Sequence, residues 1–528
     1  MLACKCHILQ IYVLDESKIA KNTKYFEPVL NSYQLTIKDP TFLIIHITSG
    51  RYNMNRSFVK DMTTGNEFRL LISFSVPMLI GNIFQQVYNM VDSIVVGKYV
   101  GAGALAAVGA TASLNFLFFS LCLGLTGGIG VVISQHFGAG DEAGVRRAIF
   151  NSIYIIAVTG LIMSLLGIIL ARPVLTWLHT PSDILDDAAS YMQIACGGIL
   201  AVAAYNCISS ILRALGDSRT PLYFLIFASL VNVVLDLILV IQFDLGVRGV
   251  AYATIVAQVI SAVGSLMYAL HRNPFFCIHK DEMHYDARLA AKCYRLGIPL
   301  AMQSSLIAIS CVALQSVVNT FGSMIVAAFT ATSRIEQLVQ QPFNSLGMAL
   351  STFTGQNMGA GRLDRVKRAL VRSVLLVAGF SLFMLIIFYA FGENIMRVFV
   401  SDADVIVFGT QALKITSWFY FALGIIYVIR SLLNGAGDAV YSMINGGVEV
   451  AGRIIFSNTL ILIPAVGKWG IWLSTALTWF ITGIASIIRY RQGKWKTIRV
   501  VENQNTAIPE KDGKETPVSG IRKRLSVS

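Results

Sequence analysis

The sequence predicts an all-α integral membrane protein, with twelve transmembrane helices in two pseudo-symmetric six-helix lobes. Three observations support this prediction: the composition, the recurrence of long apolar segments and an internal repeat. Of the 528 residues, 55% are hydrophobic and only 13% are charged, and the mean hydropathy is +0.65. Soluble domains carry about 25% charged residues, so most of this chain is expected to lie in lipid.

A helix needs about 20 apolar residues to cross the hydrocarbon core of a membrane. Apolar segments of this length, separated by more polar connections, recur between residues 70 and 490. We therefore expect spans at residues 70–95, 105–135, 148–171, 189–212, 222–242, 249–271, 296–320, 325–353, 370–393, 408–433, 440–462 and 469–490.

The connections after even-numbered spans are rich in Lys and Arg, as at Arg146 and Arg147 after the second span. Connections after odd-numbered spans are more acidic, as at Asp183 and Asp402. Basic connections stay in the cytoplasm, so we expect a multi-pass protein of the cell membrane with both termini cytoplasmic. This topology accounts for the net charge of +13. A nucleic-acid partner is not expected, because no basic face is interleaved with stacking aromatic residues.

The chain contains an internal repeat with an offset of 221 residues. SQHFGAGDEAGVRRA (134–148) aligns with GQNMGAGRLDRVKRA (355–369), LRALGD (212–217) with LNGAGD (433–438), and GVRGVAYAT (246–254) with GKWGIWLST (467–475). Each copy holds an even number of spans, so the copies share one orientation and are related by an axis along the membrane normal. Two facing bundles of this kind enclose a central cavity, which suits a transporter that opens alternately to either side.

The repeat divides the chain into an N-terminal extension, two lobes, a linker and a tail. We expect these at residues 1–61, 62–271 (first lobe), 272–295 (cytoplasmic inter-lobe linker), 296–490 (second lobe) and 491–528 (basic cytoplasmic tail). The extension is of mixed composition and contains no signal peptide. Met62 precedes a short polar leader and the first span, so translation beginning at Met62 is one hypothesis; a genuine cytoplasmic extension is the alternative.

The first lobe carries acids where lipid-spanning helices are expected. Asp92 lies in the first span, and Asn232 and Asp236 lie one turn apart on one face of the fifth. Thr254, in the sixth span, adds a hydroxyl. An ionisable residue inside the membrane is costly and marks a functional site. Oxygen ligands of this kind suit Na⁺, and two neighbouring carboxylates can also share a proton.

The second lobe lacks these acids at the equivalent positions, which hold Leu314, Arg453 and Ser457. The repeat therefore does not require the acids, and we expect one cation-coupling site, in the first lobe alone. Four other polar residues of the second lobe are candidates for the cavity or substrate: Gln303, Gln315, Arg334 and Glu336. Glu449 and Arg453 are spaced to pair along one helix, and bracing within the lobe is the more common role of such a pair.

Several classes of protein are excluded by missing motifs. The sequence contains no GxxxxGK[ST], HExxH or GxSxG pattern, so neither ATP hydrolysis nor a common intramembrane enzyme is indicated. The eight cysteines are scattered and have no zinc or redox spacing, apart from one Cys-x-Cys at residues 4–6. We expect no cofactor, and no metal other than Na⁺ at the coupling site.

Five stretches resemble the multidrug and toxic compound extrusion (MATE) transporters: PMLIGNIFQQVYNMVDSIVVG, SQHFGAGDEAGVRRA, RALGDSRTP, NVVLD and GVRGVAYAT. The resemblance covers about residues 62–495. It implies a V-shaped pair of lobes, a monomer, and export of amphipathic, often cationic compounds in exchange for H⁺ or Na⁺. It also implies that Asp92, Asn232, Asp236 and Thr254 form the cation-coupling site. Some members carry acids in spans seven and ten, but residues 296–320 and 408–433 contain none here.

A flippase for a lipid-linked precursor, in the same superfamily of folds, is the alternative function. Such a protein needs a cavity lined by many basic residues to bind pyrophosphate. Only Arg334, Arg430 and Arg453 are expected inside the membrane, which favours the efflux antiporter.

Overall fold

The computed structural model describes residues 59–178, 180–498 and 500–501, and every regular element in this part of the chain is a helix. The first half contains α3 (Glu67–Val95), η1 (Val96–Val100), α4 (Ala102–Gly138), α5 (Glu142–Trp177), α6 (Ser182–Gly197), α7 (Ile199–Ala214), α8 (Arg219–Leu237), η2 (Ile238–Gln242) and α9 (Gly246–Arg272). Two short turns follow, η3 (Pro274–Phe276) and η4 (Lys280–Glu282). The second half contains α10 (Ala287–Val318), η5 (Asn319–Phe321), α11 (Ser323–Gly359), α12 (Leu363–Phe399), α13 (Ala403–Ser417), α14 (Tyr420–Ala436), α15 (Ala439–Leu460), η6 (Gly467–Trp469), α16 (Gly470–Gln492) and η7 (Lys494–Lys496).

The all-helical membrane fold is confirmed. Among the described residues, 8 helices are long and apolar enough to cross a membrane, and two bent pairs, α6–α7 and α13–α14, bring the number to 10. The helices α11 and α15 are long enough, at 37 and 22 residues, but too polar to pass the same test. Each of the twelve predicted spans thus coincides with one helix or one bent pair.

The fourth and tenth predicted spans each consist of two helices joined by a bend. The first is bent by 43° between α6 and α7, and the second by 51° between α13 and α14. The α6–α7 break falls at Gly197 and Gly198, where adjacent glycines weaken the helix. α10 begins at Ala287, within the residues 272–295 that were expected to form the linker, and the Asp286 side chain accepts hydrogen bonds from the backbone N–H groups of Arg288 and Leu289.

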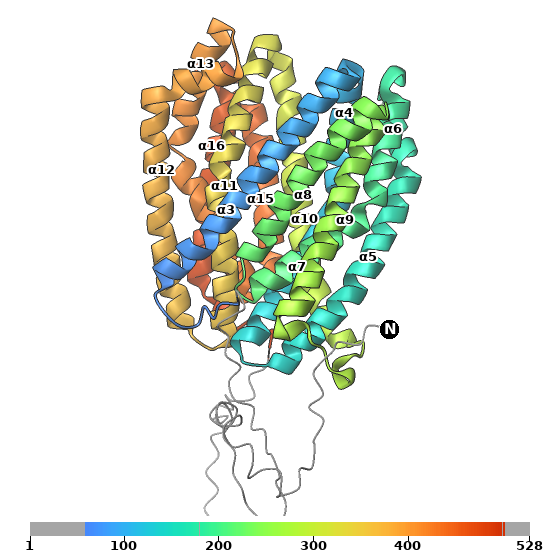
Figure 1. The fold of residues 1–528 in the computed structure, drawn as a ribbon. Coiled ribbons are helices and arrows are strands. Elements are labelled where there is room, and N and C mark those ends of the chain that lie inside the picture. The colour runs from blue at the N-terminus through green and yellow to red at the C-terminus, as the bar shows by residue number, and fades with distance from the viewer. Residues whose placement is uncertain (1–58, 179, 499, 502–528) are drawn as a thin grey trace, which may run out of the picture.

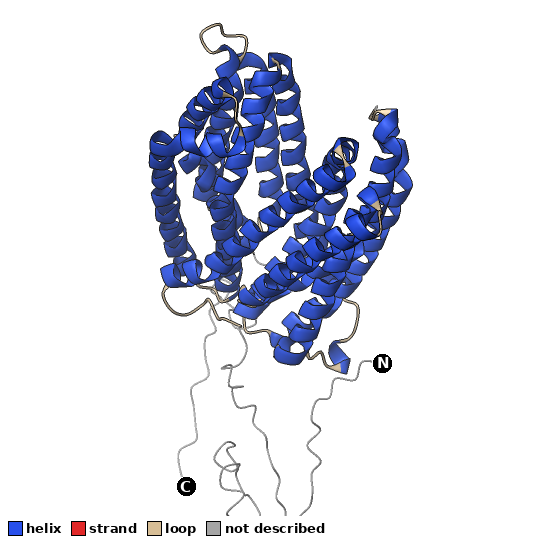
Figure 2. Cartoon of the chain, turned by 45° about the horizontal axis from the view of Figure 1, so that its top comes forward, coloured by secondary structure: helices blue, strands red, loops and turns tan. Residues whose placement is uncertain are grey.

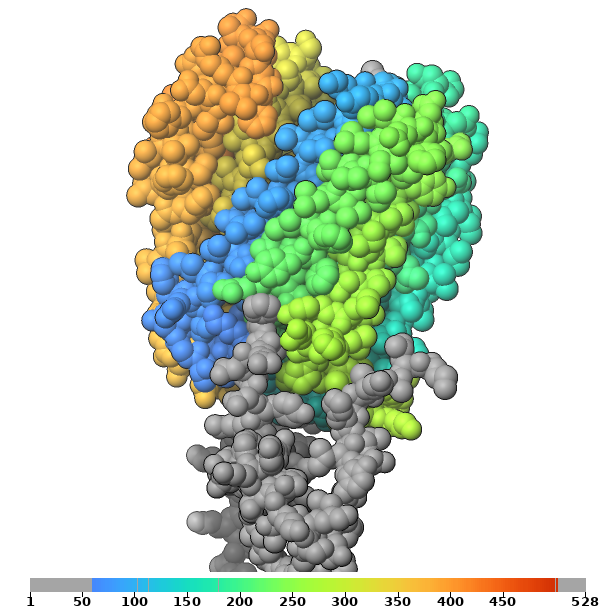
Figure 3. Space-filling view, in the orientation of Figure 1, coloured from blue at the N-terminus to red at the C-terminus, as the bar shows by residue number. Residues whose placement is uncertain are grey.

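The two halves exchange their first helices. α3 begins against α11 and α12 of the second half and ends against α8 of the first (Figure 1). α10 makes the equivalent crossing, from α4 and α5 to α15. Both helices contain a proline, Pro77 or Pro299, near the point of crossing. Figure 3 shows α3 lying across the face between the two groups of helices.

Small residues allow the closest of these crossings. Gly124 and Gly128 of α4 lie against Ala301 and Gly297 of α10, and a Cβ at either α4 glycine would collide with the α10 backbone. Close backbone approach through small residues is the usual packing between helices in lipid. The exchange and this contact make the two halves one packed unit.

The helices converge at the end where the turns 139–141, 215–218, 360–362 and 437–438 lie, which we call the closed end, and diverge toward the other (Figure 2). The connection between the halves passes over the closed end. Its Phe275 and Phe276 are buried, and Glu282 binds Arg146 of α5 through two 2.8 Å hydrogen bonds.

We predict that Glu282→Gln lowers the stability of the protein by about 3 kcal/mol at pH 7, because Arg146 loses its buried counter-charge. Burial raises the pKa of the Glu282 carboxyl, but hydrogen bonds from Arg146 and from the backbone N–H of His279 hold that pKa below its usual value. The contribution of a carboxyl with a lowered pKa is present above its unfolded pKa, about 4.3, and is lost as the pH falls through the lowered value.

Thermal unfolding in detergent across a pH series measures this difference. Glu142→Gln is the matched control, since Glu142 contacts the same Arg146 but is exposed, and a change below about 0.5 kcal/mol is expected. Equal unfolding temperatures for Glu282→Gln and wild type at pH 7 would contradict the prediction.

Candidate functional site

The structure brings the four predicted first-lobe residues together. Asn232 and Asp236, on α8, are 2% and 0% exposed. The Asn232 amide donates to the Thr254 hydroxyl of α9 over 3.4 Å. The Asp92 carboxyl, on α3, lies close enough to the Asp236 carboxyl to interact with it directly. Three helices therefore contribute oxygen atoms to one buried cluster.

Four oxygen atoms of this cluster have no hydrogen-bond donor among the described residues. Within the described residues no donor reaches Asp92 Oδ1, Asn232 Oδ1 or either carboxylate oxygen of Asp236. Buried polar atoms are almost always hydrogen-bonded, and an isolated buried charge is very unfavourable. All four unpartnered atoms are acceptors, so a proton or a small cation is the species that would satisfy them. Carboxylate, amide and hydroxyl oxygens are hard ligands that fit Na⁺ as well.

The backbone next to this cluster is distorted on both acid-bearing helices. α3 continues into the π-helical turn η1, four residues after Asp92, and α8 continues into η2, two residues after Asp236. Single π-helical turns of this kind are common at functional sites. Apolar residues on these turns and the adjoining helices, among them Val96, Val240 and Val250, form a packed cluster. This cluster covers the acids on the side away from the closed end.

Two tyrosines near the acids were missed by sequence reasoning. The hydroxyl of Tyr191, on α6, interacts electrostatically with both Asp92 and Asp236, and that of Tyr88, one turn before Asp92, interacts with Asp92. No motif marks Tyr191. The sequence does not indicate that Tyr191 lies near the acids, because α6 packs against α9 only through the bend between α6 and α7.

The second-lobe candidates do not form one equivalent site. Glu336 approaches Thr416, Tyr420 and Arg453, but its Oε1 has no hydrogen-bond partner among the described residues. Gln303 is buried beside Arg430, and with its side-chain amide assigned so that the oxygen faces the guanidinium, that oxygen accepts two 3.0 Å hydrogen bonds.

The remaining two candidates lie elsewhere. Gln315 donates to Asn319 over 2.9 Å, and Arg334 is exposed on α11. Within the described residues no hydrogen bond joins any two of the four candidates.

The pair Glu449 and Arg453 lies at 3.3 Å within the second lobe. Arg453 also donates to the Ser310 hydroxyl over 2.9 Å. The position equivalent to Asn232 thus holds an arginine that is paired with an acid, so the second lobe does not repeat the unpartnered acids of the first.

Two glutamines from the repeat lock the closed end reciprocally. Gln135 of α4 donates to the Gly435 carbonyl of α14 over 3.0 Å, and Gln356 of α11 donates to the Ala214 carbonyl of α7 over 2.9 Å. Donors and acceptors are both related by the offset of 221 residues. Each glutamine oxygen also accepts from a segment outside the helices, Gln356 from Met62 N at 2.8 Å and Gln135 from Val500 N at 3.3 Å.

The GAG triplets explain how the helices come this close. A Cβ at Gly138 would collide with the Gln356 carbonyl, and one at Gly359 with the Gln135 carbonyl. Gly140 and Gly361, with φ of 73° and 72°, make the turns that follow. The second glycine of each triplet therefore forms a tight turn, and the first allows close contact between the lobes.

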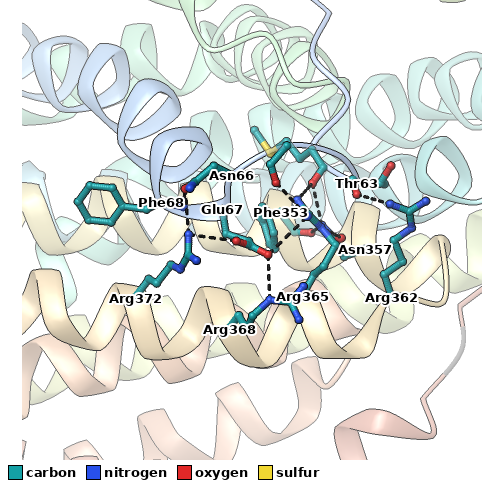
Figure 4. A network of polar contacts seen from close by, with 12 residues as sticks. Thr63, Asn66, Glu67, Phe68, Phe353, Asn357, Arg362, Arg365, Arg368 and Arg372 are labelled. Atoms are coloured by element: carbon teal, nitrogen blue, oxygen red, sulfur yellow. Dashed lines mark hydrogen bonds and ion pairs between the residues drawn. The ribbon is translucent and has the colours of Figure 1, made fainter.

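An ionic network fastens the start of α3 to the second half (Figure 4). Glu67 pairs with three arginines of α12, at 3.4 Å from Arg365, 3.0 Å from Arg368 and 3.0 Å from Arg372. Asn357 and Arg365 also donate to the Met62 carbonyl. Residues 62–67, which lead into the first helix of the first half, are therefore held by the second half.

A duplicated helical membrane fold with a buried, unneutralised acid cluster and a lock between its halves defines an integral membrane transporter. The chain belongs to the MatE family: the family model matches residues 77–238 and 299–458, one match in each half. The chain is therefore a multi-pass membrane protein, a MATE family transporter and not an enzyme.

Three relatives illustrate the similarity. The chain is 31% identical over 443 residues to the "Probable multidrug resistance protein YpnP" of Bacillus subtilis, covering 83% of this chain and 98% of that protein. It is 22% identical to the "FAD transporter" of Shewanella oneidensis, covering 79% and 93%. A solved structure, described as the outward-facing conformation of a multidrug resistance MATE family transporter of the MOP superfamily, matches with a TM-score of 0.77 at 22% identity, over 83% of this chain and 98% of that one.

We predict that Asp236→Asn raises the thermal stability of the protein at neutral pH by about 1–3 kcal/mol, because a buried carboxylate without donors is replaced by a neutral amide. The unfolding temperature of the purified protein measures the effect. Asp217→Asn is the matched control: Asp217 is also buried, but it accepts hydrogen bonds from Arg219 N and Thr220 N at 3.0 Å each. There, the same substitution weakens charge-assisted bonds and should lower stability. A fall in stability for Asp236→Asn would show that its carboxylate braces the lobe.

We predict that Gln135→Ala combined with Gln356→Ala loosens the closed end. Each buried hydrogen bond contributes about 1 kcal/mol, so losing both should shift the equilibrium toward separated lobes by about tenfold or more. Spin labels at the exposed positions 142 and 364, in a cysteine-depleted background, report the distance across the closed end. Gln492→Ala, which removes only a contact with Arg489, is the control. An unchanged distance distribution in the double variant would contradict the prediction.

Proposed function

We propose that this transporter exports amphipathic, often cationic small molecules in exchange for H⁺ or Na⁺, by alternating access. The observation that supports the proposal most strongly is the cluster of Asp92 and Asp236, whose buried oxygens have no donor among the described residues. Family membership supports small-molecule transport in general. The relatives named as multidrug resistance proteins support multidrug efflux as its particular form.

The cluster would couple transport through a change of charge. With a proton or Na⁺ bound, the first lobe is locally neutral and its helices can pack closely around the acids. After release, two carboxylates without counter-charge favour hydration and separation of α3 from α8, which alters the shape of the lobe. A ligand shifts an equilibrium only through different affinities for two conformations, and this change supplies such a difference. Asn232 and Thr254 would complete the coordination.

The orientation follows from the closed end. Basic residues gather there, including Arg146, Arg362 and Arg365, so we place this end and both termini in the cytoplasm of a cell. The structure then represents the form closed to the cytoplasm. We further propose that the protein acts as a monomer, because one chain already contains both lobes, the lock between them and the complete acid cluster.

The names of the relatives indicate different kinds of substrate, because they include multidrug resistance proteins and an FAD transporter. A flippase for lipid-linked precursors would need a strongly basic cavity. Arg453 and Arg430 are engaged by Glu449 and Gln303, which supports the efflux antiporter over that alternative. Gln303 and Glu336 would line or support the substrate path of the second lobe, and Arg334 and Gln315 would contribute at its exposed surface.

We predict that proteoliposomes holding the protein expel ethidium when a Na⁺ or pH gradient is imposed, and that Asp92→Asn abolishes the gradient-driven part. The loss follows because the variant cannot change charge when the cation binds. Measuring the initial efflux rate under each gradient separately identifies the coupling ion.

Glu393→Gln serves as the control, since Glu393 is an exposed acid whose one ion-pair partner among the described residues is Arg397, and its efflux should match wild type. Unchanged gradient dependence in Asp92→Asn would overturn the coupling role of this cluster. Absence of efflux under both gradients in wild type would overturn the antiport proposal.

A further inference from the structure

A small cavity lies between the two halves, just beyond the glutamine lock. It is bounded by α4 and α7 of the first half and α11 of the second, and its volume is ≈ 260 Å³. Most of its polar lining comes from Ser134, Asn206, Ser210, Arg213, Ser351 and Thr352. No acidic residue lines it.

The charged group of this cavity is Arg213, in the last turn of α7. Within the described residues its guanidinium has no ion pair and no hydrogen bond, and its one close electrostatic neighbour is the Tyr205 hydroxyl. The nearest acid along the chain, Asp217, is engaged by Thr220 and by the backbone that begins α8. Arg213 therefore carries a positive charge that the surrounding protein does not balance.

Several other arginines near the closed end are paired with acids, unlike Arg213. Three examples are each paired with an acid: Arg146 with Glu282, Arg365 with Glu67, and Arg489 with Asp438. The repeat does not explain Arg213 either, because the equivalent position holds Asn434, whose side chain accepts from Ser442. The packing of α7 thus does not account for an arginine here.

Further donors face the cavity from the second lobe. The hydroxyls of Ser351 and Thr352, on α11, have no hydrogen bond among the described residues. Those of Ser134 and Ser210 already donate to backbone carbonyls. The free donors therefore come from Arg213 on one lobe and from α11 on the other.

We propose that this cavity binds the anionic group, a carboxylate or a phosphate, of a small-molecule substrate. The planar guanidinium matches both groups in a bidentate manner, and the α11 hydroxyls can bind the remaining oxygens. Drug-sized ligands occupy about 300–1,000 Å³, so the cavity holds a charged head group while the rest of the molecule lies between the lobes. This inference rests on the proposed export function and extends its substrates to compounds that carry an acidic group.

The position of the cavity links such a ligand to the lock. Arg213 directly precedes Ala214, whose carbonyl accepts the hydrogen bond from Gln356. An anion held by Arg213 and Thr352 would contact both lobes while the closed end is locked, and would lose one set of donors when the lobes separate. The bound group therefore favours the locked form.

Equilibrium binding to the detergent-purified full chain tests this, with carboxyfluorescein as the anionic probe and ethidium as the cationic one. We expect Arg213→Gln to weaken carboxyfluorescein binding by about tenfold to a hundredfold and to change ethidium binding less than twofold. Arg213→Lys should recover part of the affinity, and Thr352→Val, on the other lobe, should weaken carboxyfluorescein about threefold. Excess inorganic phosphate should compete with the probe in wild type.

Arg248→Gln is the matched control, because Arg248 is exposed and, among the described residues, its guanidinium hydrogen-bonds only to Ser190. Unchanged carboxyfluorescein affinity in Arg213→Gln, or an equal loss for ethidium, would overturn the proposal, as would the absence of competition by phosphate. If Arg213→Gln does not fold, Thr352→Val replaces it, and an unchanged carboxyfluorescein affinity in that variant would overturn the proposal. The binding experiment needs no ion gradient. Failure of gradient-driven efflux would therefore refute the antiport proposal without affecting the measured anion binding.

Discussion

A carboxylate inside a lipid bilayer has no water to solvate it, and Asp236 has no donor within the described protein to replace that water. The arrangement around it follows from this constraint. Asp92 adds a second acid rather than a base, Asn232 turns its amide N–H toward Thr254, and π-helical turns break the regular backbone immediately afterwards. In the proposed mechanism, a bound cation or proton would satisfy these oxygens, and the cluster would thereby respond to an ion gradient.

The two lobes share their packing but not their charges. Each half sends its first helix across to the other, and each contributes one glutamine to the lock at the closed end. Where the first lobe has Asn232 and Asp236, the second has Arg453, already neutralised by Glu449. In the proposed mechanism, the duplicated fold would allow the two lobes to move in a related way, and the acids of the first lobe would respond to the ion.

α8 connects the acid cluster to the closed end. It begins at Arg219, beside the turn that carries Asp217 and close to the Ala214 carbonyl of the lock, and it bears Asp236 near its other end. At about 1.5 Å per residue, this rigid element reaches about 25 Å through the first lobe. A tilt of α8 on ion binding would move the acid cluster and the adjoining part of the closed end together. Arg213 lies in the last turn of α7, close to the start of α8. A ligand bound to Arg213 between the lobes would therefore be displaced by a tilt of α8.

The sequence alone determined the helical membrane fold, the duplication and the residues of the acid cluster, because apolar length, repeat spacing and an acid among apolar residues are properties of the chain itself. The bends after Gly197 and Ser417, the exchange of α3 and α10, and the approach of Tyr191 to the acids were decided by tertiary packing. Gln135 was visible in the repeat, yet its partner, Gly435, is 300 residues away. Which polar groups stay unpaired depends on every neighbour in space, and that information exists only once the lobes have packed.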